Sequence, residues 1–211
     1  MAWYDIFAKF YDVVLERVYR EHRIQANTAL NLTPGQTVVD IGCGTGASFA
    51  ALVNSVGPNG RIIGIDTSAG MLRAAKKRVQ RAGWTNIELV EIEPGGDKRV
   101  LAEIGEVDRV LCFLSLSVIK NWDEVLSDWF ALLSSEGRMV IADVHHPRPN
   151  IYGRYVEFVS RGKLSRKSWE PLSELSSDFS LDWQPSSWVL GGRFFVAAGN
   201  RLLVDSKGHK E

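Results

Sequence analysis

Residues 38–47 combine a short apolar strand, a glycine turn and the start of a helix. Gly42, Gly44 and Gly46 stand at alternate positions of the turn, with Cys43 between the first two. Their missing Cβ atoms let the backbone approach a ligand closely, and the free N–H groups of the following helix point to the same place. The pattern predicts a cradle for a nucleotide-like ligand.

Two acidic residues stand at the ends of the strands that flank this turn. Asp66 follows the predicted strand 61–65, twenty residues after Gly46, where a carboxylate can accept hydrogen bonds from both hydroxyls of a ribose. Asp40 stands two residues before Gly42, at the end of the first strand. Both carboxylates are therefore expected to face the ligand.

Two cofactors fit this arrangement. A dinucleotide fits because Gly42, Gly44 and Ala47 match the G-x-G-x-x-G/A fingerprint. S-adenosylmethionine fits better, because the Asp40 carboxylate repels a pyrophosphate but attracts an ammonium group and a sulfonium centre. The alternatives are an NAD-dependent oxidoreductase, for which we identify no hydride-transfer residues, and a non-catalytic regulator that binds S-adenosylmethionine without turnover.

Three stretches carry a resemblance to a known family. Residues 38–46, 64–72 and 4–12 resemble class I S-adenosylmethionine-dependent methyltransferases, and most of all the ubiquinone/menaquinone biosynthesis methyltransferases and their small-molecule relatives. The resemblance covers most of residues 1–145, and it is more specific for the cofactor than for the substrate. It implies an α/β, Rossmann-like single domain over residues 1–211, with a seven-stranded, mostly parallel sheet and helices on both faces.

The resemblance also implies roles for individual residues. The glycine loop would pass beneath the methionine portion of the cofactor, with Asp40 at its amino end and Asp66 on the ribose. Glu93 stands where the family usually has an Asp that accepts from the adenine amino group, with Asp97 in reserve. The expected cofactor-binding set is Tyr11, Asp40, Gly42, Cys43, Gly44, Gly46, Asp66, Thr67, Met71, Glu93 and Leu114.

The end of the strand 138–144 carries two candidate catalytic residues, His145 and His146. Carboxyl ends of strands in open α/β sheets face the ligand crevice, so either imidazole could be a general base near neutral pH. The alternative is a polar pair that satisfies loop backbone. No metal is expected, because the end of the strand 108–114 lacks the acidic residue that magnesium-dependent relatives place there. That strand is also not followed by the Asn-Pro-Pro-Tyr segment of enzymes that methylate base or glutamine nitrogens.

Composition limits the class of protein. Lys plus Arg and Asp plus Glu number 25 each, so no global field favours nucleic acid. Two cysteines without CxxC spacing predict neither zinc nor disulfides and fit a reducing cytoplasm. With no signal peptide or apolar spanning run in this sequence, we expect a soluble, cytoplasmic protein without an integral membrane segment.

The remaining expectations concern the two ends of the chain. Helical spacing over residues 3–30 predicts a core helix, and the resemblance implies a lid over the site. Residues 147–180 are basic and aromatic, which fits either a second lid that touches an anionic headgroup or membrane surface, or an ordinary solvated segment. Residues 187–190 and 193–198 are predicted to form an antiparallel hairpin. Gly137 is predicted to end the helix that begins at Asn121.

The acceptor is expected to be a small hydrophobic or lipid-like molecule. Carbon methylation of a quinone precursor competes with nitrogen methylation of a phospholipid or small amine. The sequence leaves the oligomeric state open.

Overall fold

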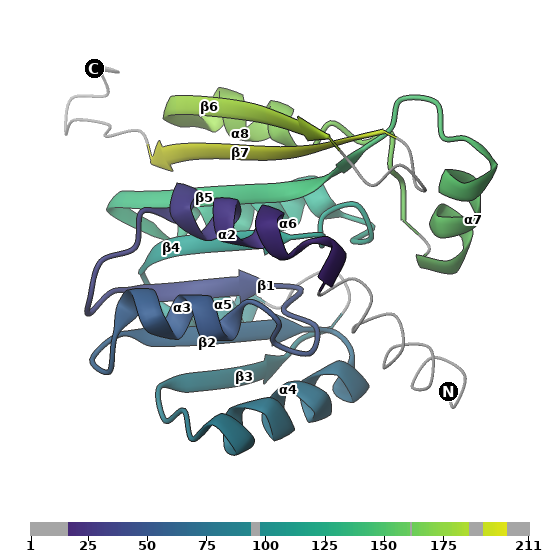
Figure 1. Cartoon of the computed structure of the whole chain (residues 1–211). Coiled ribbons are helices and arrows are strands. Elements are labelled where there is room, and N and C mark those ends of the chain that lie inside the picture. Colours follow the sequence, from purple (N-terminus) through teal and green to yellow (C-terminus); the bar gives the residue numbers. More distant parts are fainter. Residues whose placement is uncertain (1–16, 94–97, 161, 186–191, 202–211) are drawn as a thin grey trace.

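A computed structural model of the chain describes residues 17–93, 98–160, 162–185 and 192–201. Its centre is a seven-stranded sheet in the order β3-β2-β1-β4-β5-β7-β6 (Figure 1). Strands β1 to β5 run parallel, and β7 pairs antiparallel with both β5 and β6. The strands are β1 Thr37–Ile41, β2 Arg61–Asp66, β3 Ile87–Glu91, β4 Val107–Phe113, β5 Leu133–His145, β6 Ser176–Pro185 and β7 Arg193–Arg201.

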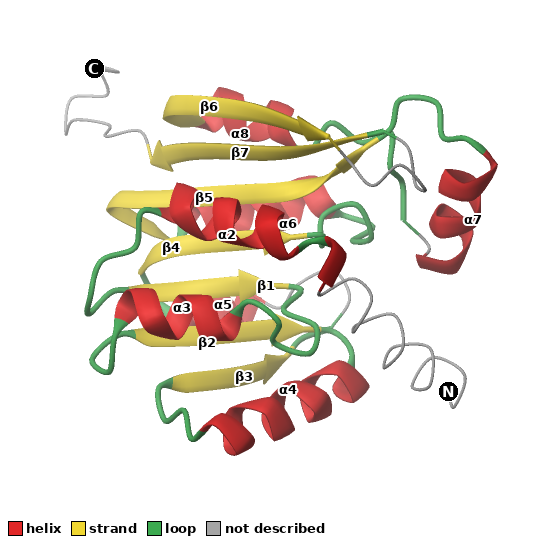
Figure 2. Cartoon of the chain, viewed as in Figure 1, coloured by secondary structure: helices red, strands yellow, loops and turns green. Residues whose placement is uncertain are grey.

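Helices cover both faces of this sheet (Figure 2). Helices α2, α3 and α4 pack on one face, and α5, α6 and α8 pack on the other. Helix α7 projects beyond the end of β5 (Figure 1). The helices are α2 Arg20–Leu30, α3 Phe49–Val56, α4 Ala69–Ala82, α5 Lys98–Ile104, α6 Trp122–Ala131, α7 Ile151–Ser160 and α8 Trp169–Leu175.

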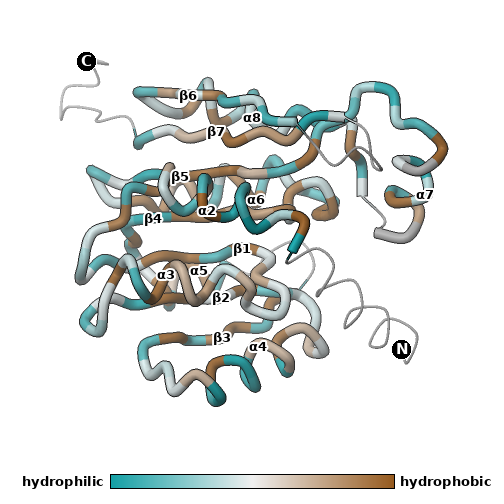
Figure 3. Tube along the Cα trace, viewed as in Figure 1, coloured by the Kyte–Doolittle hydropathy of each residue, from teal (hydrophilic) through white to brown (hydrophobic). Residues whose placement is uncertain are grey.

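The core consists of two apolar layers because the central strands are buried on both sides. Val38 of β1 faces the layer that contains α2 and α3, whereas its neighbour Val39 faces the layer that contains α6. Strands buried on both faces are near-continuously apolar rather than alternating. The hydrophobic colouring of β1, β4 and β5 in Figure 3 follows this pattern.

The expected fold is confirmed: the sheet is mostly parallel, ends in an antiparallel pair and has helices on both faces. Within the described part of the expected N-terminal helix, α2 is helical as predicted. The remainder of the expected lid, residues 1–16, lies outside the described residues. Helix α4 begins after Ser68, whose side chain accepts from the Met71 amide as an N-cap, and ends at Gly83 in the left-handed conformation.

The placement of the first strand in the C-terminal pair was wrong. The strand that pairs with β7 is β6, Ser176–Pro185, part of which falls inside the segment expected to be an insertion. Residues 187–190 lie outside the described residues. The sequence did carry the signal: Phe179, Leu181 and Trp183 are partly buried and alternate with exposed polar residues, which is the period of a strand with one covered face.

The predicted end of helix α6 was also wrong. The helix ends at Ala131, and Gly137 lies inside β5, where the pairing of β4 with β5 shifts register between Val107 and Arg109. A Cβ on Gly137 would lie 2.6 Å from the Cβ of Leu133 and 2.8 Å from the Ser134 carbonyl oxygen. This glycine is required by a bulge and not by a helix terminus.

Candidate functional site

The glycine turn follows β1 at the carboxyl edge of the sheet and is anchored to the neighbouring strand. The amides of Gly42 and Cys43 both donate to the carbonyl oxygen of Ile65, at 2.8 and 2.9 Å. Gly46 then donates to the Cys43 carbonyl at 3.0 Å, which closes the turn before α3. The turn is therefore fixed to the end of β2.

Glycine is required at the three positions of the turn for different structural reasons. All have positive φ, at +69°, +56° and +78° for Gly42, Gly44 and Gly46. A Cβ on Gly42 would lie 2.6 Å from the Cβ of Ser115, and one on Gly46 would lie 2.4 Å from the Phe49 ring. A Cβ on Gly44 would meet no atom of the described residues within 4 Å. Gly44 is thus the position at which the backbone is left open to a ligand.

The carboxylate of Asp66 connects the glycine turn to the start of α4. One oxygen accepts from the Gly44 amide and the other from the Ser68 amide, both at 2.9 Å. Burial raises the pKa of this carboxyl, and the backbone donors of Ser68, Gly44 and Thr67 oppose the rise. A carboxylate can accept about four hydrogen bonds, so capacity remains for the hydroxyls of a ribose.

Asp40 is 2% exposed, on the face of the sheet that α2 covers. Its Oδ2 has no hydrogen-bond partner among the described residues. Burial raises its pKa to about 7, with the positive charge of Arg23 lowering it and the charge of Asp66 raising it further. A buried carboxylate oxygen with no partner is costly. A cationic ligand group beside Asp40, such as the ammonium of S-adenosylmethionine, would satisfy it.

The backbone after β4 forms the next part of this edge. Leu114 has φ +53°, a conformation that few residues other than glycine adopt, and its amide donates to the Ala142 carbonyl at 2.8 Å. Its side chain is half-buried. Strained backbone of this kind concentrates at ligand sites.

The two histidines at the end of β5 lie in different surroundings. The His145 Nδ1 donates to the Arg166 carbonyl at 2.9 Å, and its ring packs edge-on against Trp169 with centroids 4.9 Å apart. The backbone of His146 donates to the Leu164 carbonyl, but its buried Nδ1 has no partner among the described residues. His146 therefore has a buried ring nitrogen that no described residue engages.

A group of aromatic rings covers the face of the sheet on which α2 packs. The His22 ring lies 4.2 Å from that of Phe194, and Phe194 lies 5.9 Å from Phe113 at the end of β4. The Arg23 guanidinium carbon lies 4.6 Å from the centre of the Phe113 ring. We name Tyr19, His22, Phe113 and Phe194 the aromatic wall.

Sequence reasoning missed both the aromatic wall and Arg23. The periodicity of α2 showed that the helix has a buried face, but it gave no indication of which strand ends that face would meet. Only the tertiary structure brings the charge of Arg23 to Asp40.

The other expected site residues lie around the same edge. Thr67 is exposed between Asp66 and α4, and Met71 is half-buried in the first turn of α4. Glu93 is exposed two residues after β3. Tyr11 and the reserve residue Asp97 lie outside the described residues.

Cys43 is buried in the glycine turn, and burial raises the pKa of its thiol, as do the charges of Asp40 and Asp66. The thiol is therefore neutral and inert at neutral pH. Within the residues that the structure describes, no three His, Cys, Asp or Glu side chains are grouped as metal ligands. Likewise, none of the described helices is long and apolar enough to cross a membrane.

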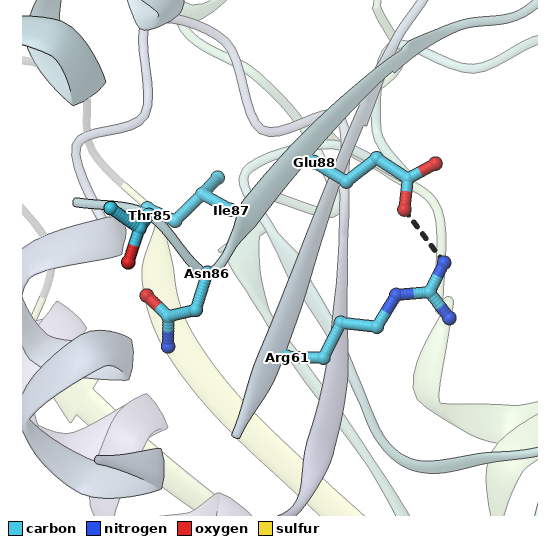
Figure 4. Close-up of a pocket in the computed structure, with 5 residues that line it drawn as sticks. All are labelled: Arg61, Thr85, Asn86, Ile87 and Glu88. Atoms are coloured by element: carbon cyan, nitrogen blue, oxygen red, sulfur yellow. Dashed lines mark hydrogen bonds and ion pairs between the residues drawn. The ribbon is translucent and has the colours of Figure 1, made fainter. Parts of the chain in front are cut away.

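A separate surface pocket lies at the opposite edge of the sheet, where β2 and β3 begin (Figure 4). It is lined by Arg61 and by residues 85–88, and Arg61 forms an exposed ion pair with Glu88 at 2.6 Å. Ligands of open α/β sheets bind at the carboxyl ends of strands. This pocket at the amino ends is therefore not the candidate site.

Comparison with known proteins assigns the family. Residues 32–181 match the model of a methyltransferase domain. The chain is 27% identical over 190 residues to a demethylmenaquinone methyltransferase of Bacillus cytotoxicus, covering 84% of this chain and 79% of that protein. It is 31% identical over 154 residues to the demethylmenaquinone methyltransferase of Lactococcus lactis, covering 69% of this chain and 60% of that protein.

A solved structure supports the same fold. The crystal structure of a SAM-dependent methyltransferase from Aquifex aeolicus matches with a TM-score of 0.60 and 16% identity, covering 89% of this chain and 92% of that one. The family match and these relatives decide between the two cofactors considered from the glycine pattern. The chain belongs to the methyltransferase domain family and is an enzyme that uses S-adenosylmethionine.

Proposed function

We propose that this enzyme methylates a ring carbon of a lipophilic quinone precursor in its reduced, hydroquinone form. The observation that carries the proposal is the similarity to demethylmenaquinone methyltransferases over 84% of the chain. The relatives reported above give no support to the phospholipid or small-amine alternative.

Different residues at the carboxyl edge would bind different parts of the cofactor. Asp40 would hold the ammonium group, and the open side of Gly44 would admit the methionine portion. Asp66 would accept from the ribose hydroxyls while it keeps the glycine turn in place. Met71 and Leu114 would cover the adenine and sulfonium regions, and Glu93 would reach the adenine amino group.

S-adenosylmethionine supplies an electrophilic methyl group when bound. The protein's part is to align the acceptor carbon with that group and to exclude water, since orientation supplies much of the rate acceleration in such displacements. A hydroquinone carbon becomes nucleophilic when a ring hydroxyl loses its proton. The enzyme therefore needs one proton acceptor at the acceptor side of the site.

His146 is our candidate for that base. Its Nδ1 is buried without a partner among the described residues, so it is available to take the hydroxyl proton. His145 has its Nδ1 engaged by Arg166 and its ring packed on Trp169. We assign His145 a supporting role in holding the end of β5.

The test of the acceptor is a methyl-transfer assay with a short-chain demethylated menaquinone kept reduced by dithionite. We expect a product heavier by one methylene unit, with the methyl group on a ring carbon when it is analysed by NMR. Absence of product, with binding of S-adenosylmethionine intact by titration calorimetry, would refute the acceptor and leave the cofactor unaffected.

The test of the base compares His146→Ala with His145→Ala. Loss of a general base typically lowers turnover by about 100-fold or more. We expect this loss in kcat for His146→Ala, with an unchanged KM for S-adenosylmethionine and loss of the acidic limb of the pH profile. For His145→Ala we expect a lower melting temperature and a retained acidic limb. The reverse pattern would move the base to His145.

A further inference from the structure

Helix α7, Ile151–Ser160, exposes large apolar side chains to solvent. Ile151, Phe158 and Tyr155 are 81%, 79% and 60% exposed. These are the three most exposed large hydrophobic residues of the described chain, followed by Ile24 at 55%. Contiguous exposed apolar side chains on one element mark a contact surface, whereas single ones do not.

The three side chains share one face of the helix. At about 100° per residue, Ile151, Tyr155 and Phe158 fall within an arc of about 60°. Gly153 lies on the opposite side and is buried, with its Cβ position 2.9 Å from Pro149 and 3.7 Å from Leu164. The small residue therefore faces the protein, and the apolar stripe faces outward.

The charges around this stripe are positive. Residues 148–167 contain six Lys or Arg and one acidic residue, in a chain whose net charge is zero. Arg148, Arg154 and Lys163 are exposed. The single acid, Glu157, accepts from the Leu164 amide at 2.8 Å, so one carboxylate oxygen is already engaged. An apolar stripe flanked by exposed cations complements an anionic lipid surface, where the side chains enter the acyl boundary and the cations meet headgroups.

The position of α7 ties this surface to the site. Strand β5 ends at His145, and α7 follows within six residues, at the same edge of the sheet as the carboxyl ends of β1 and β2 (Figure 1). Parts of the α7 trace are coloured as hydrophobic in Figure 3, and the helix lies at the periphery of the molecule in that view. A lipid surface in contact with α7 would therefore lie next to the carboxyl edge of the sheet, where the acceptor must enter.

We propose that α7 is an interfacial helix that docks the enzyme on an anionic membrane surface, through Ile151, Tyr155 and Phe158 with Arg148, Arg154 and Lys163 around them. Docking brings the carboxyl edge of the sheet to the bilayer, from which a lipophilic acceptor is taken. That consequence for the acceptor rests on the proposed function; the docking itself does not.

The test is co-sedimentation of the full-length protein with vesicles of phosphatidylcholine alone or mixed with phosphatidylglycerol, without cofactor or acceptor. We expect binding to the mixed vesicles that weakens with added salt, because exposed charges are screened. A triple variant, Ile151→Ser, Tyr155→Ser and Phe158→Ser, should bind at least about tenfold more weakly. A second triple variant, with Gln at positions 148, 154 and 163, should lose the preference for phosphatidylglycerol.

The matched control is Ile24→Ser, which removes an exposed apolar side chain from α2 and should bind vesicles as the wild type does. Failure of the wild type to bind mixed vesicles, or equal binding by the first triple variant, overturns the proposal. The proposal is also overturned if light scattering shows that the wild type is a dimer and the first triple variant is not. It is overturned as well if the wild type binds polyglutamate or an oligonucleotide and does not bind vesicles.

Activity separates this proposal from the proposed function. The first triple variant should retain wild-type turnover on a short-chain acceptor in solution and lose it on a long-chain acceptor embedded in vesicles. If no quinone precursor is methylated but vesicle binding behaves as expected, the docking surface stands and the acceptor assignment fails.

Discussion

Individual residues of the site show how the enzyme trades stability for binding. Asp40 is buried with an oxygen that no described residue engages, and Leu114 is held at positive φ. Asp143 is equally buried, yet its oxygens accept from the Ser117 amide, the Ser117 hydroxyl and the Val144 amide at 2.8 to 3.1 Å. The contrast indicates that Asp143 has a structural role, and we propose that Asp40 is kept for a ligand.

Replacing Asp40 by Asn should stabilise the free enzyme and weaken its cofactor binding. Burial raises the pKa of Asp40 to about 7, so the free energy of unfolding falls as pH rises from the unfolded pKa near 4 through that value. Asp40→Asn should remove this fall, a gain of up to roughly 4 kcal/mol at about pH 8 that vanishes at low pH. Thermal denaturation at both pH values and calorimetry with S-adenosylmethionine measure the two effects.

Asp143→Asn is the matched control for that prediction. Burial also raises the pKa of Asp143, to about 6, but the donors of Ser117 and Val144 would face an amide NH₂ in the variant. We expect lower stability at all pH values. Greater stability of Asp143→Asn, or tight cofactor binding by Asp40→Asn, would contradict the division of roles.

Comparing Gly44→Ala with Gly83→Ala separates the effect of backbone strain on stability from the effect of a ligand contact on affinity. Gly44 at φ +56° and Gly83 at φ +71° both have open space where a Cβ would stand. Alanine should therefore cost about 1 kcal/mol of stability at either position. Only Gly44→Ala should also weaken S-adenosylmethionine binding, by at least about tenfold, since its Cβ fills the open side of the turn. Equal affinities of the two variants in titration calorimetry would disprove a contact at Gly44.

At the scale of elements, two arginines fix α2 against the sheet. The Arg109 guanidinium donates to the carbonyls of Leu30 and Asn31 at the end of α2, at 2.8 and 3.3 Å. Arg138 donates to the Ala29 carbonyl at 2.8 Å. Cations at a helix C-terminus satisfy its free carbonyls and oppose its dipole. This attachment sets where α2 presents Arg23 to Asp40.

Arg109→Met should destabilise the protein by about 2 to 4 kcal/mol, because buried carbonyls lose charged donors. It should also weaken cofactor binding through the displacement of α2. The control is Arg61→Met, which removes an exposed ion pair to Glu88 and should cost under about 1 kcal/mol. Urea denaturation of both variants measures the difference; equal midpoints would show that Arg109 does not hold α2.

A second attachment orders the loop after β4. Nη1 of Arg166 donates to the carbonyls of Leu116 and Ser117, at 2.7 and 3.1 Å, and to that of Ile119. Ser117 in turn is held by Asp143 of β5. These hydrogen bonds join the segment before α8 to the ends of β4 and β5. Leu114, His145 and His146 lie at those strand ends.

For the whole molecule, the site draws on elements distant in sequence, so ligand binding should stabilise the entire fold. A ligand at a concentration 100 times its Kd adds about 2.7 kcal/mol, which for a chain of this size raises the melting temperature by about 5 to 10 °C. We expect this shift with S-adenosylhomocysteine for the wild type and a smaller one for Asp40→Asn. Differential scanning fluorimetry measures both, and no shift for the wild type would exclude the site described here.

The sequence by itself determined the fold class and the edge of the sheet at which the glycine turn, Asp40 and Asp66 meet. Local signals suffice for these, because the glycine turn, Asp40 and Asp66 lie within one strand–helix–strand unit of residues 37–66 and parallel strands end at one edge. The alternation of Phe179, Leu181 and Trp183 is likewise a local signal, and it matches the strand β6.

Only the tertiary structure decided what is close to what across that edge. The aromatic wall joins His22 to Phe194, and α2 packs on β5 through the contact of Ala29 with Arg138, 109 residues apart. The approach of Arg23 to Asp40 follows from this packing. The different surroundings of His145 and His146 follow from the way the segment before α8 returns to the end of β5. Such contacts follow from packing of whole faces and not from any local pattern. The exposure of Ile151, Tyr155 and Phe158 on α7 was decided in the same way, because the spacing of apolar residues defines a face but not what covers it.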